Sequence, residues 1–227
     1  MMDKMDKLLP LLQLCDSNFP SGAFSHSFGF ETYIFNGKIH NVETFRDALC
    51  VYIQTQLTYT DGLACRLTYD FLEEKSKEDV WRLNEMLAAL CLARETREGT
   101  RMIGERMWKI CREIYPFDIW NDYKKKRGYM YPALVFAIVC YYLEIPKETT
   151  VLSYLYTSVQ ALVQNAVRGI PLGQTDGQRL LVSVQPHLIK AVQKIHTLTE
   201  EELGAVAPGL EIAQMQHEQL SVRLFMS

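Results

Sequence analysis

The chain has 227 residues, of which 48% are hydrophobic and 22% are charged, a composition typical of a folded globular protein rather than a disordered one. Its 27 acidic residues against 24 Lys and Arg give a net charge of −3, which provides no general electrostatic attraction to nucleic acid or an anionic membrane. No apolar run reaches the roughly 18 residues that a membrane-spanning helix needs. The composition therefore predicts neither nucleic acid nor membrane as a partner.

The first residues do not form a convincing signal peptide. Asp3, Asp6 and Pro10 interrupt the leucines of this stretch, and no clear cleavage site follows them. The 6 cysteines occur singly, without a CxxC pair, which fits buried, reduced thiols better than disulfides or a zinc site. We therefore expect a cytoplasmic protein.

The segment NFPSGAFSHSFGFETYI predicts a helix near the start of the chain. Pro20 turns the chain, Ser21 is placed to cap the helix, and Gly22 begins it. Several small residues within the segment would let another backbone approach closely. This helix is therefore a candidate for close packing or for partner contact.

A carboxylate lies in the middle of the apolar side of this predicted helix. Phe24, Phe28 and Phe35 share that side on a helical wheel, and Glu31 falls between them. A carboxylate in such a position must find a partner or change its protonation, because burying an unpaired charge is costly.

We expect an arginine to satisfy Glu31, and Arg168 and Arg179 are the candidates. A functional relay through Glu31 is the alternative. His26 lies away from the phenylalanines on the wheel, so we expect it at the surface or in an interface.

Helical periodicity continues through the middle of the chain. Asn41 is placed to cap a helix over residues 42–57 that can continue to Phe71, with Gly62 as a weak point. Further helices are expected over residues 80–91 and 102–114. Residues 115–131 read as a loop, with a basic run at 124–127 that we expect to be solvated.

The next elements are separated by proline signals. Pro132 is well placed to open a buried helix through Leu143, and Ile145-Pro146 then separates it from a helix that reaches Gly169.

The segment RGIPLGQTDGQRLL, residues 168–181, predicts a tight turn with exposed amide donors before a helix. Such a turn is able to hold an anion or a carboxylate, although a purely structural turn is the simpler interpretation. Thr175 and Gln178 form a capping-box pair for the helix, and Pro186 predicts a kink or restart within it. A second such pair, Thr199 and Glu202, opens a short helix.

Residues 210–227 form an apolar tail. Taken as a helix, Leu210, Ala213 and Leu220 lie on one stripe with His217 among them. Arg223 is the formal cation of this tail and is able to fork onto a carboxylate. A terminus that is apolar on several sides is either buried or docks on a partner, and we keep both readings open.

The sequence offers no recognisable reactive centre. The 5 histidines include no pair spaced three or four residues apart, so no helix presents a paired metal-binding face. Nucleophile-elbow and nucleotide-binding loop patterns are also missing. We therefore expect a non-enzyme with no catalytic residues and no stable metal site.

All these elements predict one architecture. The fold class is all-α, a single compact domain over residues 1–227 with about ten helices and no substantial sheet.

Three segments in register resemble the urease accessory protein UreF family. They are LLQLCDSNFPSGAFSHSFGFETYI near the start, VRGIPLGQTDGQRLL three-quarters along, and PGLEIAQMQHEQLSVRLF at the end, in the order found in that family. Residues 60–150 match only as a helical pattern.

The resemblance implies an all-α scaffold that dimerises and binds the accessory protein UreD, also called UreH. That complex would recruit the GTPase UreG and deliver nickel into apo-urease. Nickel would pass through the assembled complex, through a tunnel in one view, so no cofactor is expected to bind stably to this chain.

Under that resemblance the partner-binding residues lie in the first helix, in the 173–179 turn and in the tail. They are Pro20, Gly22, Phe24, His26, Glu31, Gly173, Asp176, Arg179, His217, Glu218 and Arg223. The alternative from another class is a small helical enzyme that uses Glu31, His26 and the 173–179 turn. A third reading is a nickel store built from the histidines.

Overall fold

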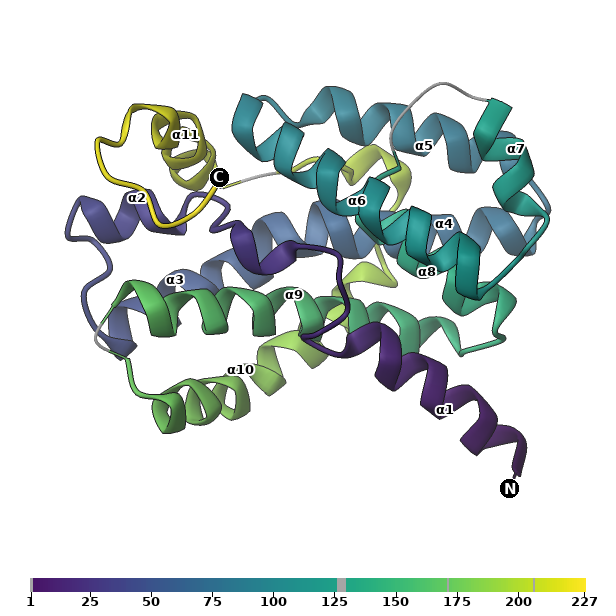
Figure 1. Ribbon diagram of the computed structural model, residues 1–227, viewed down its shortest axis with the longest axis horizontal. Coiled ribbons are helices and arrows are strands. Elements are labelled where there is room, and N and C mark those ends of the chain that lie inside the picture. The colour runs from purple at the N-terminus through teal and green to yellow at the C-terminus, as the bar shows by residue number, and fades with distance from the viewer. Residues whose placement is uncertain (1, 126–129, 171, 206) are drawn as a thin grey trace.

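The computed structural model describes residues 2–125, 130–170, 172–205 and 207–227. Within these ranges all regular structure is helical and no strand occurs, which confirms the predicted all-α class (Figure 1). The α-helices are α1 (Met2–Cys15), α2 (Phe30–Phe35), α3 (Val42–Tyr52), α4 (Leu63–Glu73), α5 (Lys77–Leu90), α6 (Arg94–Ile114), α7 (Ile119–Lys125), α8 (Pro132–Tyr142), α9 (Lys147–Gly169), α10 (Gln174–Ile195) and α11 (Pro208–Gln216). Short helical segments of other types are η1 (Ala23–Ser25), η2 (Ile53–Gly62), η3 (Glu200–Glu202) and η4 (His217–Gln219).

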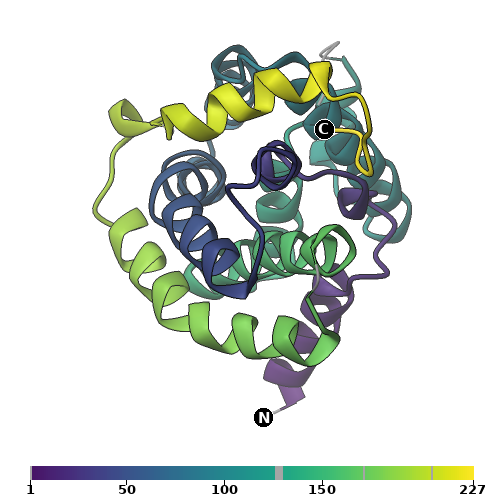
Figure 2. The ribbon, with the colours of Figure 1, turned by 90° about the vertical axis from the view of Figure 1, so that its left-hand side faces the viewer.

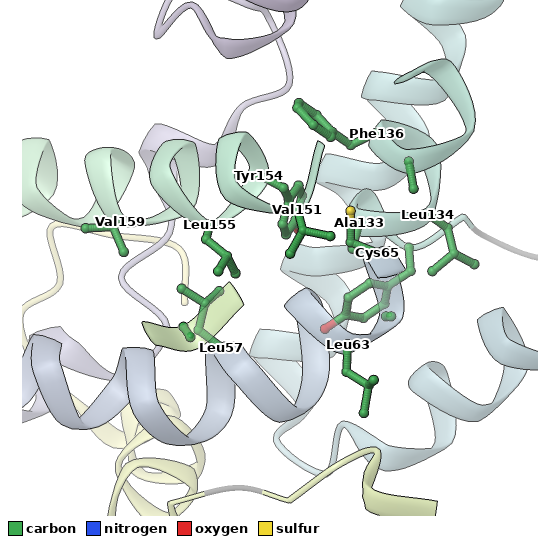
Figure 3. Close-up of a cluster of buried hydrophobic side chains, with 14 of the residues drawn as sticks. Leu57, Leu63, Cys65, Ala133, Leu134, Phe136, Val151, Tyr154, Leu155 and Val159 are labelled. Carbon is green, nitrogen blue, oxygen red and sulfur yellow. The ribbon is translucent and has the colours of Figure 1, made fainter. Parts of the chain in front are cut away.

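Helix α8 lies at the centre of the core. Its sequence PALVFAIVCYY is apolar on all sides, and every residue from Pro132 to Cys140 is buried. A helix without a polar face must be covered all round, and α4, α6 and α9 pack against it. Figure 3 shows Ala133, Leu134 and Phe136 of α8 in one buried cluster with Cys65 of α4 and Val151 of α9. The predicted opening at Pro132 is confirmed.

The helix predicted after Asn41 is also confirmed, including its cap. The Asn41 side chain accepts a hydrogen bond from the Thr44 backbone N–H at 2.9 Å. Helix α3 continues through the π-helical segment η2 into α4, so Gly62 does not interrupt the path.

The expected loop over residues 115–131 contains a helix, α7, which corrects the prediction. Ile119 and Trp120 are buried, and burial of these two large side chains stabilises a turn of helix too short to show a clear period. Of the basic run, 126 and 127 lie outside the described residues.

Helix α10 departs from its predicted start and middle. Its N-cap is Gly173, and no side chain caps it, so the expected pair of Thr175 and Gln178 is wrong. The helix runs through Pro186 without a restart. Pro186 is exposed, so the carbonyl that loses its N–H partner faces water, which lowers the cost of the proline. The Thr199 and Glu202 capping box is present at η3.

The N-terminal helix projects from the helical domain, whereas the C-terminal residues pack against it (Figure 1). Helix α1 extends outward from it, whereas the C-terminal residues lie beside the segment before α2, beneath α11 (Figures 1 and 2). Helix α11 packs on α2 and on α6. Among the described helices, none combines the length and apolar character required to cross a membrane.

A glycine permits the close crossing beside α8. A Cβ built on Gly104 of α6 would lie 1.7 Å from the Met130 carbonyl oxygen, which is backbone and has little freedom to move. Gly104→Ala should therefore lower the free energy of unfolding by about 3 kcal/mol, measured by urea denaturation. Gly173→Ala is the control, because its backbone φ of −72° suits alanine, and it should cost no more than about 1 kcal/mol, the usual effect of alanine at an N-cap. Equal effects of the two substitutions would contradict this account of the crossing.

Candidate functional site

The predicted first helix is in fact two short pieces separated by left-handed residues. Gly22 has φ +84° and Gly29 has φ +90°, conformations that a continuous right-handed helix does not contain. The result is the turn η1 followed by α2. Phe24 is therefore 58% exposed instead of sharing a buried side with Phe28, which corrects the helical-wheel prediction.

Glu31 is buried, as predicted, but its partner is a histidine of the tail. Glu31 Oε2 lies 2.8 Å from His217 Nε2, across a sequence separation of 186 residues. His217 is 0% exposed and Glu31 is 6% exposed. The prediction that Arg168 or Arg179 pairs with Glu31 is wrong.

The other nitrogen of the His217 ring lies beside a second carboxylate. His217 Nδ1 lies 2.7 Å from Glu95 Oε2, in the first turn of α6. Arg223 Nη1 donates to Glu95 Oε1 at 2.7 Å. Glu31, His217, Glu95 and Arg223 are thus joined in a chain of alternating acidic and basic side chains, here called the charge chain. Glu95 carried no sequence signal that could have identified it in advance.

The charge chain holds the backbone of residues 220–227, here called the distal tail. Glu31 accepts hydrogen bonds from the backbone N–H of Leu224 at 2.5 Å and of Phe225 at 3.2 Å. Because both oxygens of Glu31 are used in this way, its position fixes the position of the distal tail.

Further backbone contacts join the distal tail to the segment before α2. The main-chain oxygen of Ser227 accepts from the N–H of Ser27 at 2.5 Å and of Phe28 at 3.1 Å. The Met226 N–H donates to the Ser25 carbonyl at 2.8 Å. The tail is therefore helical only as far as η4, because the residues beyond it bond to another segment instead of to each other.

His26 is 1% exposed, which corrects its expected place at the surface. Its Nδ1 lies 2.8 Å from Ser227 Oγ, and its carbonyl accepts from Asn165 Nδ2 of α9 at 2.7 Å. Burial, followed by the charges of Arg106 and His217, lowers the pKa of His26 to about 4. Its ring is therefore neutral at neutral pH.

Arg168 supports the site from the end of α9, although not through Glu31. It donates to the Phe24 carbonyl at 2.7 Å and also bonds to Asn165 Oδ1. Its guanidinium lies 5.3 Å from the centre of the Phe225 ring, a cation–π distance. One side chain thus contacts both η1 and the distal tail.

Apolar side chains of the distal tail point in two directions. Phe225 is buried, whereas Val222, Leu224 and Met226 are 71%, 65% and 54% exposed. Arg168 contacts both the Phe24 carbonyl and the Phe225 ring. We call the exposed residues Phe24, Val222, Leu224 and Met226 the tail surface. Exposed apolar side chains in one short segment are candidates for contact with another protein.

Three further predicted partner-binding residues are Glu218, Pro20 and Gly22. Glu218 is paired with Arg94 at 2.6 Å, and that guanidinium lowers the pKa of the Glu218 carboxyl. Pro20 is exposed, and Gly22 is buried beneath the Arg106 side chain.

The 173–179 turn is not joined to Glu31 or His26. Asp176 pairs with Arg179 at 2.9 Å, and the Arg179 side chain is 76% exposed. Gly173 is also exposed. The three residues form a surface turn separate from the charge chain, so the structure does not assemble the site on which the enzyme alternative depends.

A cavity of about 180 Å³ lies between the segment before α2 and the helices α6 and α9. His26, Gln56, Asp61, Tyr154 and other residues of α9 line it. Asp61 accepts from Tyr154 Oη at 3.2 Å, and burial raises the pKa of its carboxyl. His26 Nε2 and Gln56 Oε1 are buried and have no hydrogen-bond partner within the described part of the chain.

Metal-ligating side chains do not gather in this cavity. Across residues 2–125, 130–170, 172–205 and 207–227, no three side chains of His, Cys, Asp or Glu come together as a ligand set. The cavity is polar enough to admit water or a passing ion, but it presents no cage of ligands.

The chain was compared with known proteins. A family model described as UreF matches residues 39–185. A protein named urease accessory protein UreF from Geobacillus kaustophilus is 67% identical over 221 residues, covering 97% of this chain and 98% of that protein. Proteins of the same name from a Bacillus species, strain TB-90, and from Lachnoclostridium phytofermentans are 55% and 53% identical, covering 98% and 97% of this chain and 100% and 98% of their own lengths.

Removing the central carboxylate should release the distal tail. Glu31→Ala leaves His217 and two backbone N–H groups without their acceptor, and should lower the free energy of unfolding by about 3–5 kcal/mol. Trypsin should then cut rapidly after Arg223, which mass spectrometry detects. Asp176→Ala, which breaks an exposed pair, is the control and should change stability by less than about 0.5 kcal/mol. A distal tail in Glu31→Ala as resistant to trypsin as in the parent would contradict the assignment.

Proposed function

Because the chain belongs to the UreF family of urease accessory proteins, we propose that it is a scaffold that docks UreD (UreH) and the GTPase UreG for GTP-dependent nickel insertion into apo-urease. The proposal rests on family membership and on one structural observation, the tail surface. That surface gathers exposed apolar side chains on a backbone that the charge chain holds in place. A surface already ordered before binding loses less conformational entropy when a partner docks.

We assign UreD to the tail surface in this scheme. Val222, Leu224 and Met226 present apolar groups, and Arg223 and Glu218 border them with charge. An apolar centre with a charged edge is the usual anatomy of a protein interface. UreG and apo-urease would join the resulting complex.

We also propose that the chain acts without catalysis of its own. Its relatives are named accessory proteins, and Glu31 and His26, the residues of the enzyme alternative, are both engaged in holding the distal tail.

We place the protein in the cytoplasm, where its 6 free cysteines would stay reduced. A homodimer is part of the proposal, and Val182 and Ile189 on the outer side of α10, 64% and 52% exposed, are available for it.

Nickel is the cargo of this complex, and we propose that it crosses this chain through the cavity beneath η1. Asp61, Gln56 and His26 offer oxygen and nitrogen atoms at intervals along the lining. Scattered single donors favour transient contact over tight binding, which suits passage.

Substitutions on the tail surface test the docking proposal. Val222→Asp, Leu224→Asp and Met226→Asp together should weaken binding to UreD by at least about tenfold, because charge would replace apolar contacts at the centre of the interface. The measurement is co-purification with UreD and UreG, followed by titration of the purified chains. The fold should survive, since the three side chains are exposed, and circular dichroism checks this.

Leu9→Asp is the matched control, an equally exposed leucine on α1, 69% exposed and away from the distal tail. It should bind UreD like the parent. Undiminished binding by the triple variant would move the docking site elsewhere, and a parent chain that fails to join UreD and UreG would refute the scaffold itself.

A bulky residue in the cavity tests the nickel route. Ala161→Phe, on the cavity side of α9, should leave the complex intact but remove most of the nickel loaded into urease. Metal content and urease activity after co-expression are the measurements, and Ala161→Ser is the control that keeps the cavity open. Normal nickel loading by a folded Ala161→Phe variant would exclude this route.

A further inference from the structure

The His217 ring is held between two carboxylates and, among the residues that the structure describes, bonds to no other group. Its two ring nitrogens lie 2.8 Å from Glu31 and 2.7 Å from Glu95. An ionised carboxylate only accepts hydrogen bonds, so a ring that donates to both carries a proton on each nitrogen and a positive charge. The charge chain is then balanced, with two positive and two negative groups.

We propose that His217 is a proton-dependent latch that holds the distal tail when its ring is doubly protonated and releases it when the pH rises. Loss of one proton turns a ring nitrogen into an acceptor that faces a carboxylate oxygen. The charge chain then holds an excess negative charge around a buried site. Two acceptors in contact are unfavourable, so either Glu31 or Glu95 must move away from the ring.

Charged and titratable groups face the His217 ring from several elements. Glu31 faces it from α2, Glu95 faces it from α6, and Arg223 reaches it through Glu95. Arg94 and Glu218 form an exposed pair beside it, and Arg106 lies near His26. Arginine keeps its charge throughout the accessible range. Burial and the charges of Arg106 and His217 lower the pKa of His26 to about 4, so His26 is neutral at pH 6 and above.

Movement of either carboxylate would remove a contact of the distal tail. Glu31 accepts the N–H groups of Leu224 and Phe225, and Glu95 accepts a hydrogen bond from Arg223. Val222, Leu224 and Met226 would then lose their fixed positions. The consequence for partner binding rests on the proposed function, whereas the release itself is a property of the isolated chain.

Hydrogen exchange of the isolated chain between about pH 6 and pH 9 tests the latch, over the range in which histidines change charge. Exchange rates of peptides from residues 220–227 are divided by the intrinsic rate at each pH, to give protection factors. We expect protection in the parent to fall by at least about tenfold as the pH rises, the value of one lost hydrogen bond to a charged group. Peptides from α8 should stay protected throughout.

Two variants separate a latch from a merely structural contact. Glu95→Gln keeps the shape, and its amide is able to donate to a neutral ring while its oxygen still accepts from Arg223, so protection should become independent of pH. His217→Gln is unable to donate on both sides, so protection should be low at every pH. Glu218→Gln, which changes the exposed neighbouring pair, should follow the parent profile.

A flat profile in the parent would overturn the proposal, and so would a Glu95→Gln variant that loses protection like the parent. Neither result depends on UreD or UreG, because no partner is present. If His217→Gln does not fold, the comparison of the parent with Glu95→Gln still decides the question.

Discussion

The Glu31 carboxylate is the constraint around which this end of the molecule is organised. It is buried on α2, where an unpaired negative charge would be strongly unfavourable. His217 supplies the compensating group, and two backbone N–H groups of the distal tail complete the set of donors. The position of the C-terminal residues is thus a consequence of the need to satisfy one acidic side chain near the start of the chain.

The body of the protein provides a rigid base for this arrangement. Helix α8 is enclosed by α4, α6 and α9, and two of those helices also reach the site. Helix α6 carries Glu95 in its first turn, and α9 brings Asn165 and Arg168 beneath the segment before α2. Side chains that hold the distal tail therefore come from elements anchored in the core, which limits their movement.

The sequence predicted the local features of this fold well and its distant pairings badly. Asn41, Pro132 and the Thr199 pair mark helix starts through contacts within three residues, and all three hold. Thr175 fails because the helix already begins at Gln174, which places Thr175 inside the first turn and not at the N-cap. The partner of Glu31 lies 186 residues away, and no local pattern encodes such a pairing. The position of His217 on the apolar stripe of the tail was the one local feature that indicated its burial.

Side chains of the distal tail alternate between buried and exposed positions, and substitutions at the two kinds of position have different consequences. Phe225 and Ser227 face the chain itself, so a change there alters folding whatever the partner is. Val222, Leu224 and Met226 face outward, so changes at these positions leave the fold intact. Under the docking proposal, exchanging these three side chains would refit the protein to a different partner without rebuilding the molecule that carries them.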